Sequence, residues 1–411
     1  MARLVLKFGG TSVGDIERIK NVAKKVKQEV DAGHEVAVVV SAMSGVTNQL
    51  VDYCKQIAKV HDQAEYDAVV ASGEQVTSGL LAIALQEIGI PARSWQGWQI
   101  PLIADETHGK SRIERIDTTT LSDNMSQGVV GVVAGFQGVT EKGRIATLGR
   151  GGSDTSAVAL AAALKADRCD IYTDVDGVYT TDPRIVKSAR KLHRVTYEEM
   201  LEMASLGAKV LQTRSVEMAM KHHVRVQVLS TFEQAAGSEL PGTLVVDEDE
   251  IVEQELVSGI AYSRDEAKIT LIGVEDQPGV AARIFGPLTD AAINVDMIVQ
   301  NVSEDGRTTD MTFTVGKADI DRAVQVLEKS KDTLNYRRLV SDANVVKVSV
   351  IGVGMRSHAG VAQRMFKALA DRGINIQVIS TSEIKVSVLI AEEYTELALR
   401  SLHTAYGLDK A

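Results

Sequence analysis

The sequence predicts an α/β protein: an αβα sandwich with a mainly parallel sheet, followed by two ferredoxin-like βαββαβ domains. Three observations support this. β-branched runs alternate with helical stretches through the first half of the chain, an acidic and weakly patterned stretch follows at residues 245–255, and a repeated motif lies beyond it. Strands that alternate with helices are typical of a parallel sheet covered on both faces.

The first half supplies the elements of one domain, residues 1–247. A strand at VLKF (5–8) is followed by a helix over 14–30, a strand at VAVVVSA (36–42) and a long helical region near 65–88 that ends at Gly89. Further strands are predicted at 128–135, 168–174 and 224–230, with helices after Ser153 and near 208–221.

The second half contains an internal repeat. GVAARIFGPLTDAAINVDMI (279–298) aligns without gaps on GVAQRMFKALADRGINIQVI (360–379), at an offset of 81 residues. Each copy reads as a strand, a turn, a helix and a second strand, which begins a βαββαβ unit. We expect domains at 260–340 and 345–411, with interleaving of their strands left open. A plain pair of packing modules would give the same repeat.

Composition excludes several classes. The 411 residues carry a formal charge of -10, so a nucleic-acid or anionic-membrane partner is not expected. The two cysteines, Cys54 and Cys169, lack the spacing of a zinc or redox site. No apolar run approaches the roughly 20 residues of a membrane span, and the N-terminus is unlike a signal peptide. A soluble, cytoplasmic protein is expected.

Three loops offer chemistry at strand ends. KFGGTSV (7–13) places a cation and two glycines where a parallel sheet opens its ligand crevice, although a tight turn would look similar. LGRGGSDTSAVALAAALKA (148–166) runs from glycines into a helix, with Ser153 as the expected N-cap and Arg150 beside Asp154. TDVDGVYTTDPR (173–184) supplies carboxylates and hydroxyls after a buried strand, as a surface turn also could.

Two further motifs are set aside. HGKS (108–111) resembles the end of a Walker A loop, but Ala104 stands where the first glycine is required and no clear strand precedes it. GVGMRS (352–357) resembles a dinucleotide fingerprint, but Ser357 replaces its last glycine.

Six motifs in register resemble the aspartate kinases of the amino-acid kinase family, and the two repeats resemble that family's ACT domains. The motifs are KFGGTSV, SAMSGVTNQL (41–50), SGEQVTS (72–78), GRGGSDTSA (149–157), TDVDGVYTTDPR and GAKVLQ (207–212). The resemblance covers essentially the whole chain and implies an amino-acid kinase-like sandwich.

The resemblance implies roles for individual residues. Glu74 would pair with the substrate ammonium, Arg150 would clamp its α-carboxylate, and Asp154 would orient the lysines and help place Mg²⁺, without a dedicated metal site. The catalytic set would be Lys7, Arg150, Asp154 and Lys209. ATP would contact Lys7, Phe8, Gly9, Gly10, Thr173, Asp174, Tyr179, Arg184 and Lys209. Aspartate would contact Ser41, Thr47, Glu74, Arg150, Gly151, Gly152, Ser153 and Asp154.

The implied reaction is ATP- and Mg²⁺-dependent phosphorylation of the β-carboxylate of L-aspartate, the first step toward lysine, threonine and methionine. Lysine, threonine or both would inhibit it through the ACT domains. The implied effector contacts are Asp276, Gly279, Asn294, Asp296, Gln300, Gly360, Val361, Asn375, Ile376, Thr381 and Ser382. Association into a homo-oligomer through the ACT domains is expected, and a separate short C-terminal product of the same gene stays open.

Two alternatives remain at this stage. A related kinase acting on glutamate would use the same carboxylate chemistry. A catalytically inactive amino-acid sensor would keep the repeats but has no need for Lys7, Arg150, Asp154 and Lys209 together.

Overall fold

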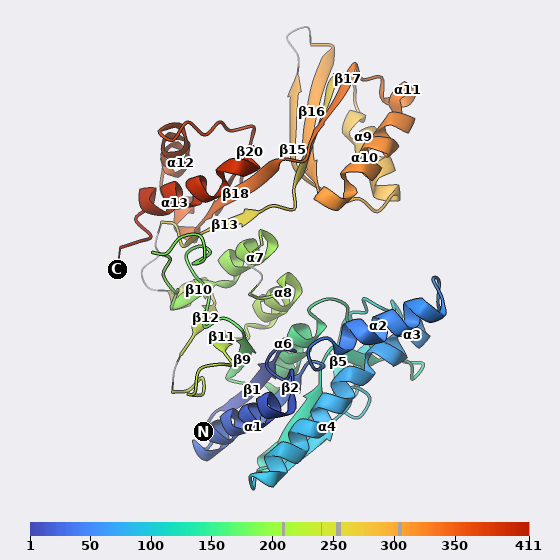
Figure 1. The fold of residues 1–411 in the computed structure, drawn as a ribbon, viewed down its shortest axis with the longest axis vertical. Coiled ribbons are helices and arrows are strands. Elements are labelled where there is room, and N and C mark those ends of the chain that lie inside the picture. Colours follow the sequence, from blue (N-terminus) through green and yellow to red (C-terminus); the bar gives the residue numbers. More distant parts are fainter. Residues whose placement is uncertain (208–209, 240, 252–255, 303–305, 411) are drawn as a thin grey trace. The chain divides into compact units, whose positions relative to one another are not determined.

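The computed structural model describes residues 1–207, 210–239, 241–251, 256–302 and 306–410 (Figure 1). They form two compact units. Among the described residues, the first unit comprises 1–178, 191–204 and 210–251 apart from residue 240, and the second comprises 179–190, 205–207 and 256–410.

The first unit is built on an eight-stranded sheet in the order β10-β12-β11-β9-β1-β2-β6-β3. β11 and β12 pair antiparallel, and the other neighbours pair parallel. The strands are β1 (Arg3–Phe8), β2 (Glu35–Val40), β3 (Ala92–Trp95), β6 (Val130–Ala134), β9 (Arg168–Thr173), β10 (Arg194–Thr196), β11 (Val226–Ser230) and β12 (Thr243–Val246). The β-branched runs of the sequence therefore form the buried centre of this sheet, as predicted.

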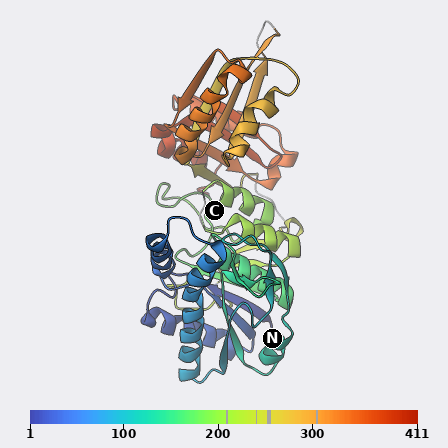
Figure 2. The same ribbon diagram turned by 90° about the vertical axis from the view of Figure 1, so that its right-hand side faces the viewer.

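Helices cover both faces of the sheet, because side chains along each strand alternate between the two sides. Leu4, Leu6 and Phe8 of β1 share one hydrophobic core with helices α1 (Ile16–Asp31) and α4 (Ser72–Glu87). The two helices contact each other beside the sheet (Figures 1 and 2). Lys7 points to the opposite face, toward α6 (Gly152–Leu164). The arrangement is the predicted αβα sandwich.

The remaining elements of the first unit surround this sandwich. A small sheet has the order β5-β4-β7-β8. Its strands are β4 (Leu102–Ala104), β5 (Ile113–Ile116), β7 (Gln137–Val139) and β8 (Ile145–Thr147), and the other helices are α2 (Val46–Ile57), α3 (Gln63–Val70), α5 (Thr119–Ser126), α7 (Tyr197–Ser205) and α8 (Thr213–His222).

The stretch 63–87, which contains α3 and α4, is long and apolar enough to cross a membrane by length and composition. Half of its most apolar window is buried inside the protein. Leu81 and Leu85 of α4 belong to the sandwich core.

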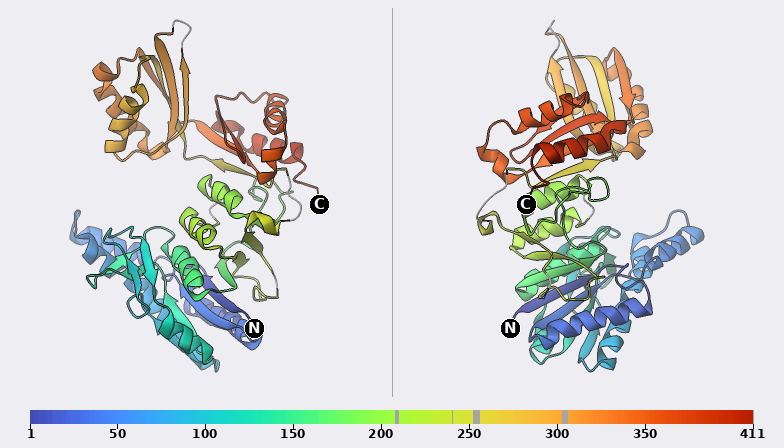
Figure 3. Two further views of the ribbon diagram at one scale, coloured as in Figure 1. Left: turned by 180° about the vertical axis from the view of Figure 1, so that it is seen from behind. Right: turned by 60° about the vertical axis from the view of Figure 1, so that its left-hand side comes forward.

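The second unit contains two antiparallel four-stranded sheets (Figure 3). One has the order β15-β16-β14-β17, and α9 and α10 pack on it. Its elements are β14 (Ala267–Glu275), α9 (Val280–Asp290), β15 (Val295–Val302), β16 (Thr308–Val315), α10 (Ile320–Lys329), α11 (Lys331–Leu334) and β17 (Arg338–Asp342). This is the βαββαβ order expected from the repeat.

The other sheet has the order β13-β18-β20-β19 and packs against α12 and α13. Its elements are β13 (Gly259–Ser263), β18 (Val345–Ile351), α12 (Val361–Ala370), β19 (Val378–Thr381), β20 (Lys385–Ala391) and α13 (Thr395–Ala405). β13 precedes the whole first repeat in the sequence, yet it pairs with β18. The first ferredoxin-like body is therefore inserted between two strands of the second.

The segment Tyr179–Arg190 belongs to the second unit, although the sequence analysis placed it in the first domain. The Thr180 carbonyl accepts from the N–H of Ile260 at 2.7 Å, and the Thr180 hydroxyl lies 2.9 Å from Nε2 of His403 on α13. Val186 lies in the hydrophobic core that α12 and α13 share. This loop is a structural part of the second ferredoxin-like body.

Candidate active site

The carboxyl ends of β9, β1 and β2 meet at one edge of the large sheet, because the three strands are parallel and adjacent. Lys7, Ser41 and Thr173 lie at or just beyond these ends. In open parallel sheets, ligands bind in the crevice at this edge. The predicted motifs of the first unit therefore converge where a ligand would be expected.

Lys7 and Asp154 form an ion pair at this edge. The Lys7 Nζ lies 2.5 Å from Oδ1 of Asp154, and the two residues are only 8% and 9% exposed. Asp154 lies in the first turn of α6, where the helix dipole favours a negative charge. The pair joins the first glycine motif to the second.

The glycine turn after β1 is shaped for close backbone approach. The N–H groups of Ser12 and Val13 donate to the Gly9 carbonyl, and a side chain at Gly10 would come within 3.0 Å of the Ala42 carbonyl. The Phe8 side chain is fully buried and stacks on Tyr172, with ring centroids 4.6 Å apart. Phe8 can therefore offer a ligand only its backbone.

Glu74 is buried in the first turn of α4. Its Oε1 accepts from the N–H of Ala42 at 3.0 Å, whereas its Oε2 has no partner among the residues that the structure describes. Burial raises the pKa of this carboxyl to about 7. A buried acceptor oxygen without a donor is costly, so Glu74 is suited to an incoming ammonium group.

The second glycine loop, Gly149–Gly152, leads into α6. The helix begins with Gly151 as its N-cap at φ +71°, and Ser153 is the second helical residue. The predicted Ser153 cap is therefore wrong, because Gly151 adopts a left-handed conformation that other residues avoid. Ser153 packs closely against Gly135. A Cβ added at Gly135 would lie 3.0 Å from the Cβ of Ser153.

Arg150 is exposed on this loop. Its guanidinium makes no hydrogen bond or ion pair with the part of the chain that the structure describes. A guanidinium presents a planar fork of donors that matches a carboxylate. Arg150 is therefore available to clamp an anionic ligand. Thr47, in the first turn of α2, and Ser41 are partly exposed.

The residues expected to hold the nucleotide are divided between the units. Thr173 and the exposed Asp174 end β9 in the first unit. Tyr179 and Arg184 lie in the second unit, where Arg184 pairs with Asp182 at 2.7 Å. This pairing lowers the pKa of the Asp182 carboxyl. Lys209 lies outside the described residues.

The expected effector residues flank corresponding positions of the two ferredoxin-like bodies. Gly279 and Gly360 are the N-caps of α9 and α12, at φ +88° and +94°. The other exposed members of the set are Asn294, Asp296, Gln300, Asn375, Thr381 and Ser382, while Asp276 and Ile376 are partly exposed. Val361 instead points into the hydrophobic core.

One expected effector residue has an internal partner. The Asp296 carboxylate lies 2.7 Å from Nζ of Lys347, which also pairs with Glu266 at 2.5 Å. Burial alone would lower the pKa of Lys347, but Glu266 and Asp296 outweigh it and the pKa is raised. An effector ammonium at Asp296 would therefore compete with Lys347.

Sequence reasoning missed Phe136, which the structure places beside the second glycine loop. Its backbone has φ +68°, which is uncommon for an aromatic residue, and its carbonyl accepts from the N–H of Leu148. Such strain often marks functional sites. The glycine before it, in the VAGF sequence, was the available signal.

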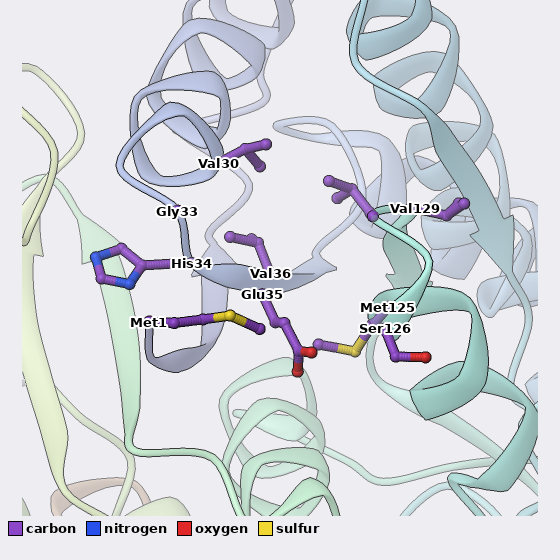
Figure 4. A pocket seen from close by; sticks show the side chains of 11 residues that line it. Met1, Val30, Gly33, His34, Glu35, Val36, Met125, Ser126 and Val129 are labelled. Carbon is purple, nitrogen blue, oxygen red and sulfur yellow. The ribbon is translucent and has the colours of Figure 1, made fainter.

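A pocket of about 240 Å³ lies elsewhere, at the amino ends of β1, β2 and β6 (Figure 4). Its lining includes Met1, Val36, Met125 and Val129. It lies at the edge of the sheet opposite the ion pair of Lys7 and Asp154. In the described parts of the chain, no group of three or more His, Cys, Asp or Glu residues is arranged to hold a metal ion.

A parallel αβα sandwich with glycine turns and an ion pair at its strand ends is typical of α/β enzymes that handle anionic ligands. Comparison with known protein families identifies the family of each part of the chain. Residues 2–230 match the amino acid kinase family, and residues 268–332 and 348–406 each match an ACT domain.

Similar proteins cover the whole chain. The aspartate kinase Ask_LysC of Stutzerimonas stutzeri is 58% identical over 100% of this chain and 98% of its own length. Aspartokinase 2 of Bacillus subtilis is 47% identical over 100% of this chain and 99% of its own length. E. coli aspartokinase III, whose structure was solved with aspartate and ADP, is 27% identical. Its structure matches with a TM-score of 0.78 and covers 98% of this chain and 99% of its own chain. The chain therefore belongs to the aspartate kinases of the amino acid kinase family.

Proposed function

We propose that the protein transfers the γ-phosphoryl group of ATP to the β-carboxylate of L-aspartate, giving 4-phospho-L-aspartate and ADP. The observation that carries this proposal is the Lys7–Asp154 pair at the strand ends, with Glu74 and Arg150 on neighbouring elements. E. coli aspartokinase III, which is similar over nearly the whole chain, was solved with aspartate and ADP.

The step needs no general base. A β-carboxylate has a reference pKa of about 3.9, so it is already ionised at neutral pH. One of its oxygens forms a bond to the γ-phosphorus while the bond to the β,γ-bridging oxygen breaks, and that electron pair leaves on ADP. The main barrier is the approach of two anions, so cations and positioning supply most of the rate.

Two residues would hold the ammonium and α-carboxylate groups that all amino acids share. The unpaired Oε2 of Glu74 would receive the substrate ammonium, and the free Arg150 guanidinium would hold the α-carboxylate. Lys7 would then face the phosphate oxygens, with Lys209 assigned the same role by the resemblance. The side chains of Ser41, Thr47 and Ser153 would complete the aspartate site.

Mg²⁺ would enter bound to ATP and neutralise part of the phosphate charge. Asp154 would help to position it, and the ion pair of its carboxylate with Lys7 at the strand ends supports this role. Thr173, Asp174, Tyr179 and Arg184 would hold the nucleotide.

Regulation by lysine or threonine through the ACT domains is part of the proposal. E. coli aspartokinase III was also solved with lysine and aspartate. The Tyr179–Arg190 segment supports regulation of this kind, because it carries two residues assigned to the nucleotide and belongs to the unit that contains the ACT domains. An effector that favours one arrangement of this unit would change how Tyr179 and Arg184 are presented.

The wider setting follows from this activity. The enzyme would act in the cytoplasm at the first step toward lysine, threonine and methionine, and would associate into a homo-oligomer through its ACT domains.

The test is incubation with ATP, Mg²⁺ and one amino acid, with hydroxylamine present to trap an acyl phosphate. Aspartate should give hydroxamate in step with ADP. Turnover with glutamate only would identify the other carboxylate kinase, and absence of ADP release with either amino acid would identify an inactive sensor.

A further inference from the structure

Asp67 is a buried carboxylate in α3 that belongs to none of the sequence motifs. It is fully buried and accepts hydrogen bonds from two loops. Its Oδ1 lies 2.5 Å from the Thr147 hydroxyl, and its Oδ2 accepts from the Thr147 N–H and the Gly109 N–H, each at 3.0 Å. His108 Nδ1 lies 2.8 Å from the same Oδ2. A buried carboxylate with this many donors fixes its partners firmly.

The two loops that Asp67 joins are the HGKS stretch and the start of the second glycine loop. Thr147 ends β8 and immediately precedes Leu148 and the glycines. A side chain at Gly149 would approach the Gly109 carbonyl to 3.2 Å, so the two loops lie in close contact. The HGKS stretch, which lacks the first glycine of a Walker A loop, therefore packs against the second glycine loop.

Arg214 holds the same loops from α8. Its Nη1 donates to the Leu148 carbonyl at 2.6 Å, and its Nη2 donates to the Ser111 carbonyl at 2.7 Å. Burial lowers the pKa of this guanidinium. The side chain of Gln212, the N-cap of α8, fills the space where a Gly151 side chain would lie.

We infer that Asp67 and Arg214 are positioning residues for the aspartate site, because together they fix the loop that carries Arg150. Neither needs to touch a substrate. The inference rests on the proposed function, since Arg150 matters only if the enzyme binds the α-carboxylate of an amino acid. A misplacement of about 1 Å in such a clamp is enough to cost about 100-fold in rate.

The loop that Asp67 holds is distinct from the first glycine turn, which follows β1 and is proposed to meet ATP. Loosening the Arg150 loop should therefore raise the KM for aspartate and leave the KM for ATP nearly unchanged. A purely structural role for Asp67 would lower thermal stability without this split.

The test measures both KM values for the full-length enzyme. Asp67→Asn should raise the KM for aspartate about tenfold, because an amide NH₂ would face backbone donors, while the KM for ATP stays within twofold. Thr147→Val should give a smaller rise, and Thr147→Ser, which keeps the hydroxyl, should restore wild-type values. Arg214→Lys keeps the charge but replaces the planar fork of two separate nitrogens with a single nitrogen, so the carbonyls of Leu148 and Ser111 would no longer be held in the same geometry and the aspartate KM should also rise.

Asp170 provides the matched control. It is another fully buried carboxylate of the first unit, and its hydrogen-bond partners are the side chains of Arg168, at 2.5 Å, and Gln227, at 3.3 Å, rather than residues of the glycine loop. Asp170→Asn should lower the Tm while both KM values stay within twofold.

The outcomes separate this inference from the proposed function. If the wild-type enzyme releases ADP with aspartate but Asp67→Asn leaves the aspartate KM within twofold, or raises both KM values equally, the inference is overturned alone. If Asp67→Asn does not fold, the Thr147→Val and Thr147→Ser pair decides. A wild-type enzyme without aspartate-dependent turnover overturns both.

Discussion

The carboxylate of Glu74 receives the backbone N–H of Ala42 at 3.0 Å on one oxygen and leaves its other oxygen buried without a described partner. Ala42 follows β2 and Glu74 lies in the first turn of α4, so the contact joins the carboxyl end of β2 to this helix. The first turn of α4 therefore holds a buried acceptor oxygen whose hydrogen-bonding capacity is not satisfied by the described residues.

The pH dependence of aspartate binding should follow from this contact. Burial raises the pKa of Glu74 to about 7 in the free enzyme, so the carboxyl is protonated below that value and loses its attraction for the substrate ammonium. The KM for aspartate should rise as pH falls from 8 to 6, while the KM for ATP should change little.

Glu74→Gln is the variant that checks this assignment. The amide cannot ionise, so the KM of the variant for aspartate should be at least tenfold above that of the wild type at pH 8. This KM should not change between pH 8 and pH 6. A wild-type pH dependence retained in the variant would mean that another group titrates.

The contact between Thr180 and His403 should influence nucleotide binding. Burial, aided by Arg190 and partly offset by Asp409, lowers the pKa of His403 below its ordinary 6.5. The imidazole is therefore neutral at pH 7 and can accept the Thr180 hydroxyl at 2.9 Å. His403→Phe removes this bond, worth about 1 kcal/mol, and should raise the KM for ATP about threefold to fivefold.

His222, exposed at the end of α8, supplies a control for that experiment. His222→Phe should leave both KM values within twofold. An unchanged ATP KM in His403→Phe would show that the Tyr179–Arg190 segment does not depend on this bond.

Effector sensitivity should be separable from catalysis. Asp276 and Asn375 belong to the second unit, whereas the residues assigned to aspartate belong to the first. Changing either residue to Ala should raise the lysine or threonine concentration needed for half inhibition at least fivefold, with kcat within twofold. Inhibition curves with each amino acid alone and with both together would measure this. Unaltered curves would place the effector site elsewhere.

Much of the fold is readable from the sequence because strands and helices leave distinct hydrophobic periods. The β-branched runs predicted β1, β2, β6, β9 and β11 near their observed positions. The repeat predicted the βαββαβ order of the first ferredoxin-like body, but the second body takes its remaining strand, β13, from before the first repeat. The proximity of Lys7 to Asp154 agrees with the family resemblance, which implies that Asp154 orients the lysines.

The remaining features depend on tertiary packing, which has no local signal. Nothing in TDVDGVYTTDPR marks the point at which the chain passes into the second unit. The pairing of β13 with β18 spans the whole first repeat. Asp67 stands in an ordinary helix, and its partners are distant in sequence. Even the cap of α6 was assigned to Ser153 because the left-handed backbone of Gly151 is visible only in the structure.

The central claim is that cations in the crevice allow two anionic reactants to meet, and the turnover of Lys7→Ala tests it most directly. Lys7 is buried beside Asp154 at 2.5 Å. The kcat should fall at least 100-fold, because removal of one preorganised hydrogen-bond donor typically lowers kcat by about 10²–10³-fold. The circular dichroism spectrum should stay that of the wild type. A correctly folded variant whose kcat lies within threefold of wild type would contradict the account.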